Sequence, residues 1–366
     1  MTNFESYPLH GGQLRRISES FGIPAAELLD FSANINPSGP PLSVLATLRA
    51  CLDELTTLTE YPDLQQTELK KSLACYTGTH ETNVVVANGF VPLLDATLRA
   101  LKIRSCLLPV PAFVEYRRIL ERAGVEIVPC LLSPGSSFSY DPETMFTGQE
   151  EAVLLANPQN PSGISHTSAR LRDLVAKASR RKAYVLLDEA FIDYIPENSL
   201  ATMIDRFPNL IIFRSVTKFH GIPGLRVAYA IANPSLSTAI NDQLAPWPIT
   251  TLASRAVIAA VEDQTYATRS RLENLTRRST LQYDLASSGL TVYPSAANFI
   301  LFRLPPLIDP DAFWKHLIVQ HRIVLRSCAN YEALQEGHFR VAIRAESEND
   351  KLAKAVSKAL FELNQY

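Results

Sequence analysis

The sequence has little of several features that mark particular classes of protein. Cysteine occurs only five times in 366 residues, and the five are scattered, odd in number and without a CxxC pair. This pattern argues against a disulfide framework or a zinc site, so we expect no bound metal. Reduced, mostly buried thiols are typical of a cytoplasmic protein, which is the location that we predict.

Charge of one sign and long apolar runs are also scarce. The formal net charge is −2, whereas a protein that binds nucleic acid usually carries a basic stripe. No apolar run reaches the roughly 18 residues that a membrane span needs. The first ten residues lack a basic segment followed by an apolar one, so no signal peptide is expected. We therefore predict neither a nucleic-acid partner nor a membrane partner.

What the sequence does contain is a regular alternation of strands and helices between residues 84 and 230. Apolar, partly β-branched runs predict strands that are covered on both faces. Amphipathic segments such as FVEYRRILERAG lie between them and predict helices. This alternation indicates an α/β domain with a mostly parallel sheet. The predicted strands are residues 83–88, 105–110, 126–132, 152–157, 183–188, 209–215 and 226–232.

The pattern changes after about residue 250. A long helical segment from Thr250 to Gly289 is followed by strand-like stretches and a terminal helix, which indicates a smaller α+β domain. The first 40 residues are rich in Gly, Pro and Asn and resemble an arm that packs on another part of the protein. We therefore expect an N-terminal arm (1–40) packed with the small domain, a large domain (41–245) and a small domain (246–366).

Polar clusters follow several of the predicted strands, and together they predict a cofactor. Asp188, Asn160, Lys218 and Arg226 emerge at one edge of the sheet, where ligands of such domains bind. Pyridoxal phosphate requires this set of groups. Its aldehyde needs a lysine, its pyridine nitrogen a carboxylate, its phenolic oxygen a donor, and its phosphate hydroxyls and a cation.

The spacing of these residues resembles that of a known family. Ser215, Lys218, Gly224 and Arg226 match SxxKxxxxxGxR, residues 157–163 match NPxNPxG, and residues 188–190 form DEA. As an ordered set, these motifs resemble the class I/II aminotransferase family of fold-type I pyridoxal phosphate enzymes. The resemblance covers nearly the whole chain and implies a large domain with a mostly parallel sheet, a smaller α+β C-terminal domain and an N-terminal arm.

The resemblance also implies a role for each site residue. Lys218 would form the Schiff base with the aldehyde, and Asp188 would pair with the pyridine nitrogen. One departure concerns the phosphate, because Phe90 and Val91 stand where relatives usually carry small or polar residues. The other cofactor-binding residues implied are Asn160 for the phenolic oxygen, Ala190 and Phe113 for the two ring faces, and Ser215, Arg226, Gly89 and the backbone of Phe90 and Val91 for the phosphate, with Tyr61 reaching the phosphate of a partner subunit.

Within the family, two subfamilies with phosphorylated substrates compete. The stretches HGGQ, DFSANINPSGPP and VLRSCANY are similar to threonine-phosphate decarboxylases of cobalamin biosynthesis. Phe191 stands where histidinol-phosphate aminotransferases normally carry a tyrosine. The decarboxylase resemblance implies that Arg340 binds the substrate carboxylate. It further implies that Arg326, His10 and Asn34 bind the phosphate of a small phosphorylated amino acid.

Several alternatives stay open at the level of sequence. The chain could be an aminotransferase of this fold, or a protein that has lost catalysis and serves as a binding module. O-Phospho-L-serine could replace O-phospho-L-threonine as substrate. Asn36 is an alternative to Asn34, His10 could simply be solvated, and Phe113 could be a core aromatic. The arm and Tyr61 imply a homodimer with two-fold symmetry.

Overall fold

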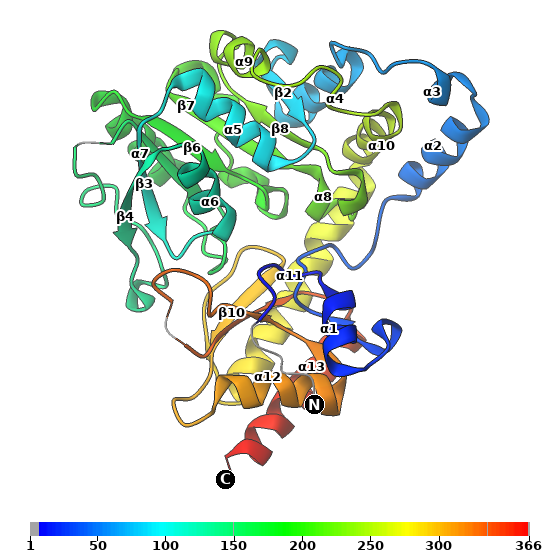
Figure 1. Ribbon diagram of the computed structural model, residues 1–366, viewed down its shortest axis with the longest axis vertical. Helices are drawn as coiled ribbons and strands as arrows, with labels where there is room; N and C mark the ends of the chain where they lie inside the picture. Colours follow the sequence, from blue (N-terminus) through cyan, green and yellow to red (C-terminus); the bar gives the residue numbers. More distant parts are fainter. Residues whose placement is uncertain (1–6, 149, 335, 365–366) are drawn as a thin grey trace.

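The computed structural model describes residues 7–148, 150–334 and 336–364, so the part of the predicted arm formed by residues 1–6 lies outside the described residues. The chain forms a large lobe on a seven-stranded sheet and a smaller lobe on a four-stranded sheet. Helix α11 (Gln264–Ser287) runs from one lobe to the other (Figure 1).

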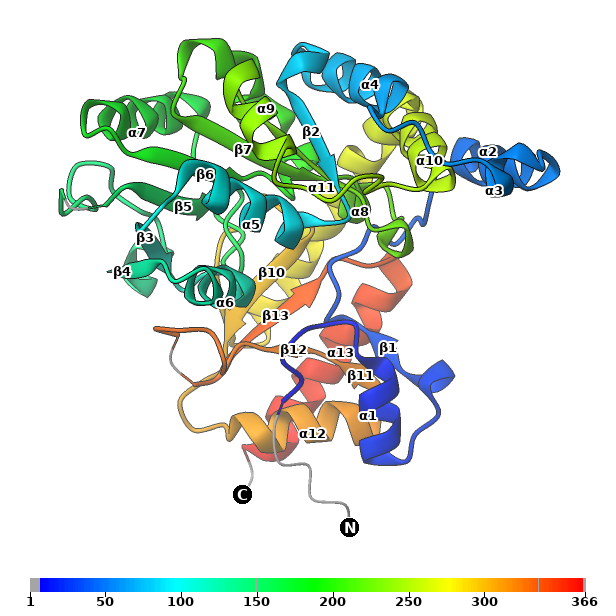
Figure 2. The same ribbon diagram turned by 45° about the horizontal axis from the view of Figure 1, so that its top comes forward.

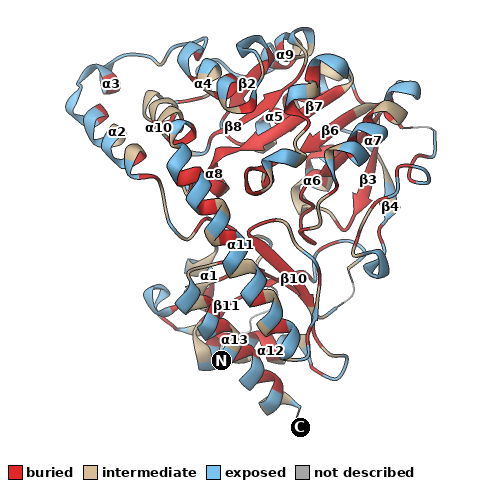
Figure 3. Cartoon of the chain, turned by 180° about the vertical axis from the view of Figure 1, so that it is seen from behind, coloured by how far each residue is buried: buried red, intermediate tan, exposed pale blue. Residues whose placement is uncertain are grey.

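The large sheet confirms the seven strands predicted between residues 83 and 232. Its order is β2-β8-β7-β6-β5-β3-β4, and only β8 runs antiparallel to its neighbours. Most of these strands are buried along their whole length, as Figure 3 shows, whereas β4 lies at an edge and is half exposed. The strands are β2 (Val84–Ala87), β3 (Ser105–Val110), β4 (Glu126–Leu131), β5 (Ala152–Ala156), β6 (Tyr184–Asp188), β7 (Leu210–Ser215) and β8 (Ala228–Ile231).

Helices cover both faces of this sheet, because successive strand residues point to opposite sides. In β2, Val84 and Val86 join the core formed with α4, α7 and α10, while Val85 and Ala87 join the core formed with α5, α6 and α9. The short helix α8 follows β7, and α2 and α3 project to one side (Figure 2). The helices of this lobe are α2 (Leu42–Asp53), α3 (Thr56–Thr59), α4 (Thr67–Thr77), α5 (Phe90–Leu101), α6 (Val114–Arg122), α7 (Ser168–Arg180), α8 (Val216–Phe219), α9 (Pro234–Asn241) and α10 (Thr251–Glu262).

The small lobe unites the C-terminal part of the chain with the N-terminal arm. Its sheet has the order β12-β13-β10-β9, and β1 of the arm pairs in parallel with β11. Ile17, Leu28 and Phe31 of the arm lie in the same apolar core as α12 and α13. The elements are α1 (Leu14–Phe21), β1 (Leu29–Asp30), β9 (Thr291–Val292), β10 (Phe299–Arg303), α12 (Pro310–His321), β11 (Ile323–Val324), β12 (Arg326–Ser327), β13 (His338–Ala342) and α13 (Glu346–Leu363).

One helical segment differs from the expectation. The stretch predicted as a single long segment from Thr250 is divided at Asp263, whose side chain accepts a hydrogen bond from the Tyr266 amide and caps α11. Helix α10, before this break, packs its buried alanines and valines with α2 and α4 of the large lobe. The chain therefore passes from the large lobe to the small lobe along α11, after the boundary expected at residue 246. Within the described ranges, no helix combines the length and apolar character needed to cross a membrane.

Candidate functional site

The polar residues at the strand ends converge on one cavity of about 600 Å³ between the two lobes. Parallel strands β5, β6 and β7 end side by side, with Ala156 opposite Asp188 and Asp188 opposite Phe213. The residues that follow these ends therefore reach the same edge of the sheet. The predicted residues that line the cavity are Lys218, Asp188, Asn160, Ala190, Phe113, Ser215, Arg226, Gly89, Phe90, Val91, His10, Asn34, Arg326 and Arg340.

Lys218 and Asp188 are the two opposite charges at the base of the cavity. Burial lowers the pKa of Lys218 to about 8, and the positive charges of Arg226 and Arg340 act in the same direction. Burial raises the pKa of Asp188, although hydrogen bonds from the Tyr116 hydroxyl and the Ala190 amide oppose this effect. The Tyr116 hydroxyl donates to Asp188 Oδ2 at 2.5 Å. Both groups are thus largely shielded from water, so a bound ligand would supply their remaining polar contacts.

A cradle for an anion lies at the start of α5. Gly89 precedes this helix with φ of 96°, and a Cβ built on it would lie 2.8 Å from Nη2 of Arg226. A guanidinium therefore faces the amide end of a helix, and an anion between the two would satisfy both. Ser215 and Thr217 add hydroxyls whose oxygens lie 2.6 Å apart. Phe90 packs against Phe213 with its ring centroid 5.3 Å away, so only its backbone amide serves the cradle.

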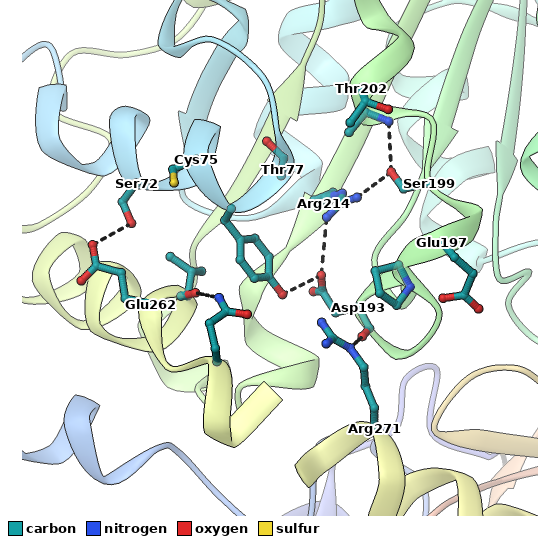
Figure 4. A pocket seen from close by; sticks show the side chains of 15 residues that line it. Ser72, Cys75, Thr77, Asp193, Glu197, Ser199, Thr202, Arg214, Glu262 and Arg271 are labelled. Atoms are coloured by element: carbon teal, nitrogen blue, oxygen red, sulfur yellow. Dashed lines mark hydrogen bonds and ion pairs between the residues drawn. The ribbon is translucent and has the colours of Figure 1, made fainter. Parts of the chain in front are cut away.

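A buried ion network supports the ends of β6 and β7 from behind. Arg214, next to Ser215, donates from Nε to Glu189 Oε2 at 3.0 Å, and Glu189 is next to Asp188. Arg214 also lines a second cavity of about 700 Å³. Figure 4 shows its bonds to Asp193 and Ser199 there. These bonds join the strand that carries Asp188 to the strand that leads to Lys218. The network therefore holds the two groups in a fixed relation.

Arg340 connects the cofactor side of the cavity with the arm. Its Nη1 donates to Asn160 Oδ1 at 2.6 Å, and its Nη2 donates to the Ser32 carbonyl at 3.3 Å. The Asn34 amide oxygen, oriented towards this guanidinium, accepts from Nε at 3.3 Å and from Nη1 at 3.2 Å. Asn36, the alternative considered for Asn34, is instead a buried structural residue whose Nδ2 donates to the Phe219 carbonyl.

Arg326 and His10 lie where the arm meets the cavity. Arg326 donates to the carbonyl oxygens of Pro8 and Leu9 at 3.1 and 2.7 Å, and so anchors the arm. His10 Nε2 lies 2.9 Å from Oε1 of Glu115, on the first turn of α6. A ligand phosphate that bound Arg326 would therefore replace the arm carbonyls as its hydrogen-bond acceptor. The phosphate would also lie close to the negative charge of Glu115.

Tyr61 is the one predicted residue that the structure does not bring to the cavity. Tyr61 is 81% exposed, and its ring packs at a tilt against Trp247, with ring centroids 4.8 Å apart. In contrast, several cavity residues were not singled out from the sequence. Their positions depend on contacts between distant segments, and only Thr217 carried a signal, as a second hydroxyl beside Lys218. These additional residues are Thr217, Tyr116, Tyr331, Glu115 and Ser32.

The chain is similar to several known proteins in sequence and in fold. The family model described as "Aminotransferase class I and II" matches residues 26–358. A threonine-phosphate decarboxylase of Salmonella typhimurium is 32% identical over 358 residues, which cover 96% of each chain. An adenosylcobalamin biosynthesis bifunctional protein of Leptospira interrogans is 27% identical over 98% of this chain and 42% of its own length. The crystal structure of a histidinol-phosphate aminotransferase from Clostridium acetobutylicum has a TM-score of 0.85 at 28% identity, covering 92% of this chain and 100% of that chain.

Proposed function

Because the chain belongs to the class I and II aminotransferase family, we propose that it is a pyridoxal phosphate-dependent decarboxylase of O-phospho-L-threonine. The product would be (R)-1-aminopropan-2-ol O-phosphate. The similarity to a threonine-phosphate decarboxylase and to a cobalamin biosynthesis protein supports this choice, and supports a role in building the cobalamin nucleotide loop.

The family confirms the predicted fold and the predicted cofactor, and the cavity residues fit that cofactor. When bound, pyridoxal phosphate supplies an electron sink for the bond that breaks. Lys218 would hold its aldehyde, Asp188 its ring nitrogen and Asn160 its phenolic oxygen. The cradle of Gly89, Ser215, Thr217 and Arg226 would hold its phosphate. Asn160 suits this role because Arg340 occupies its amide oxygen, which leaves the amide nitrogen to donate.

The observation that carries the substrate proposal is a pair of buried arginines without an acidic partner. Arg326 is 3% exposed and Arg340 is 6% exposed. Within the described residues, neither guanidinium forms an ion pair with a carboxylate, and their bonds go to carbonyl, amide and hydroxyl oxygens. Buried charges without counterions are costly, so a substrate with two anionic groups would stabilise both. A phosphorylated amino acid has a carboxylate and a phosphate.

The residues around these anions would then direct the chemistry. Arg340 would orient the carboxylate that leaves, since a guanidinium suits a carboxylate by its two-pronged geometry. Asn34 was expected to bind the phosphate, but it lies beside Arg340, so we propose that it supports the carboxylate anchor instead. Arg326 and His10 would hold the phosphate. We propose that the amine of Lys218 returns a proton to the carbon that loses the carboxylate. Its pKa of about 8 suits proton transfer near neutral pH.

A histidinol-phosphate aminotransferase is the second candidate, favoured by the similarity to the Clostridium acetobutylicum structure. Phe191 weighs against it. This residue lines the cavity and packs on Phe299 with ring centroids 4.9 Å apart, so it offers no hydroxyl to the cofactor. O-Phospho-L-serine differs from the proposed substrate by one methyl group, which a pocket distinguishes by only about 1–3 kcal/mol.

A direct assay separates these candidates. The protein is incubated with pyridoxal phosphate and either O-phospho-L-threonine or O-phospho-L-serine, without a keto acid, and released CO2 is measured. We expect CO2 from the wild-type protein, more from the threonine derivative, and none from Lys218→Ala. A requirement for 2-oxoglutarate together with glutamate formation would show an aminotransferase instead.

We also propose that the active form is a homodimer. Tyr61 lies outside the cavity of its own chain, among exposed apolar residues of α2, α3 and the segment that follows them. Such a patch favours burial against a second copy of the chain, which would bring Tyr61 to the partner's phosphate cradle. The exposed members of this patch are Leu42, Leu45, Leu52, Leu55, Leu58, Tyr61, Leu64 and Trp247.

A further inference from the structure

Tyr331 lies in the loop between β12 and β13 and lines the cavity between the two buried arginines. We propose that Tyr331 is a positioning residue that sets the separation of Arg326 and Arg340, and so selects substrates by the distance between their carboxylate and their phosphate. The inference rests on the proposed function for the identity of the two anions. It concerns a residue to which neither the motifs nor the family comparison gave a role.

The hydroxyl end of Tyr331 restrains the carboxylate anchor. This hydroxyl donates to Asn160 Oδ1 at 3.3 Å and accepts from Nη1 of Arg340 at 3.4 Å. Arg340 Nη1 also donates to Asn160 Oδ1 at 2.6 Å. The hydroxyl, the guanidinium and the amide therefore form a closed triangle of hydrogen bonds. The position of the Arg340 guanidinium therefore depends on where the tyrosine ring places its oxygen.

The ring of Tyr331 restrains the second anchor. The guanidinium carbon of Arg326 lies 5.3 Å from the centroid of this ring, a distance that suits a cation–π interaction. Arg326 and Arg340 are paired residues on adjacent antiparallel strands, so two like charges lie side by side. Burial lowers the pKa of Arg326, and the charge of Arg340 lowers it further. One side chain thus contacts both guanidinium groups, because its ring faces Arg326 and its hydroxyl accepts a hydrogen bond from Arg340.

The loop that carries Tyr331 is also tied to the large lobe. Glu332 accepts from Nε of Arg117 at 2.8 Å, and Arg117 belongs to α6, the helix that begins beside Phe113. The Tyr331 amide donates to the Cys328 carbonyl at 2.9 Å within the loop. Tyr331 is thereby fixed relative to both walls of the cavity. A residue that selects ligands by length must be held in place in this way.

The test uses holoenzyme, whose cofactor fills the cradle at α5, and two variants. Tyr331→Phe removes only the hydroxyl, whereas Tyr331→Leu also removes the ring. Binding of inorganic phosphate is measured by calorimetry, and kcat and KM are measured for O-phospho-L-threonine and the longer O-phospho-L-homoserine. The preference is the ratio of the two kcat/KM values or, if no CO2 is released, the ratio of the two dissociation constants. In Tyr331→Phe we expect phosphate to bind as in the wild type, because the ring still faces Arg326. The preference for the threonine over the homoserine derivative should fall about tenfold, as for a lost hydrogen bond to a charged group.

In Tyr331→Leu, phosphate binding should weaken as well, by about fivefold. Tyr283→Phe, on an exposed side chain of α11, is the matched control and should change neither quantity. An unchanged preference in Tyr331→Phe would overturn the inference, even if Tyr331→Leu does not fold. If wild-type protein binds both phosphoamino acids but releases no CO2, the proposed reaction fails, while the ratio of dissociation constants still decides the role of Tyr331. Failure of the wild type to bind either compound would overturn both.

Discussion

At the scale of the residue, the cavity places several charges where water cannot fully solvate them. Lys218 loses hydration and lies near Arg226 and Arg340, whose charges disfavour its protonated form, while Asp188 favours that form. The balance leaves the amine partly neutral near physiological pH. A neutral amine is the form that can attack an aldehyde, so this environment prepares Lys218 for its cofactor.

The titration of Lys218 can be measured without turnover. In protein stripped of cofactor, acylation of Lys218 by a small amine-reactive reagent, followed by peptide mass spectrometry, should reach half of its maximal rate near pH 8. The rate should fall below this pH, because protonation removes the nucleophile. In Asp188→Asn the midpoint should move lower, since the carboxylate that favours the charged amine is gone. A midpoint near the ordinary lysine value of about 10.4 would contradict this account.

Residues of the site were predictable from the sequence where a motif fixes their spacing. Lys218, Asp188 and Asn160 follow strands that are buried on both faces, and their order along the chain placed them at one sheet edge. Tyr116 and Tyr331 could not be found in this way. Each acts through a contact across the fold, such as the bond from Tyr116 to Asp188, 72 residues apart in the chain.

At the scale of the element, strands were easier to predict than the division of helices. The seven strands carry apolar runs because helices cover both faces of the sheet. The break between α10 and α11 depends instead on the single cap at Asp263. The two-residue strands β1 and β11 gave no periodic signal, so their pairing, which attaches the arm to the small lobe, was visible only as a general expectation that the arm packs there.

The start of α5 offers a second prediction. Gly89→Ala should lower both stability and cofactor affinity, because the new methyl group would strain a residue with φ of 96° and displace the Arg226 guanidinium. We expect a stability loss of about 1–3 kcal/mol, measured by urea unfolding. Spectroscopic titration should show at least tenfold weaker binding of pyridoxal phosphate.

The matched control is Gly22→Ala, at the end of α1. This residue also has positive φ, 65°, but a Cβ there meets nothing within 4 Å. Gly22→Ala should reduce stability by about 1 kcal/mol and leave cofactor affinity unchanged. Equal loss of affinity in both variants would show that the effect of Gly89→Ala is general destabilisation rather than damage to the cradle.

At the scale of the whole molecule, the residues assigned to cofactor and substrate come from different parts of the chain. Asp188, Lys218 and Arg226 lie on the large lobe, whereas Asn34 and Arg340 lie on the arm and the small lobe. The cavity forms only because the arm crosses back to the C-terminal lobe. Gly11 allows two segments of the arm to approach each other closely at the cavity, since a Cβ there would lie 2.0 Å from the Ser32 carbonyl oxygen.

Subunit mixing tests the proposed dimer. We expect Lys218→Ala to be inactive and Tyr61→Ala to retain cofactor poorly. Co-expression of the two variants should restore activity, because in a mixed dimer one site has both an intact Lys218 and an intact Tyr61 from the partner chain. Random assembly would give about one quarter of the wild-type activity. No gain on mixing would show that Tyr61 does not act across subunits.

The separation of cofactor and substrate residues also bears on how such a protein can diverge. The ion pair between Arg214 and Glu189 fixes the cofactor edge from within the large lobe, with no contribution from the arm or from β12 and β13. Arg340 is the exception in those strands, because it contacts Asn160 and its charge acts on Lys218. Substitutions elsewhere in the arm and in those strands can therefore change which molecule enters the cavity, and which of its bonds is placed for reaction, while the cofactor stays in place. A new reaction can then arise by exchange of one wall of the cavity, with the inherited chemistry of the other wall intact.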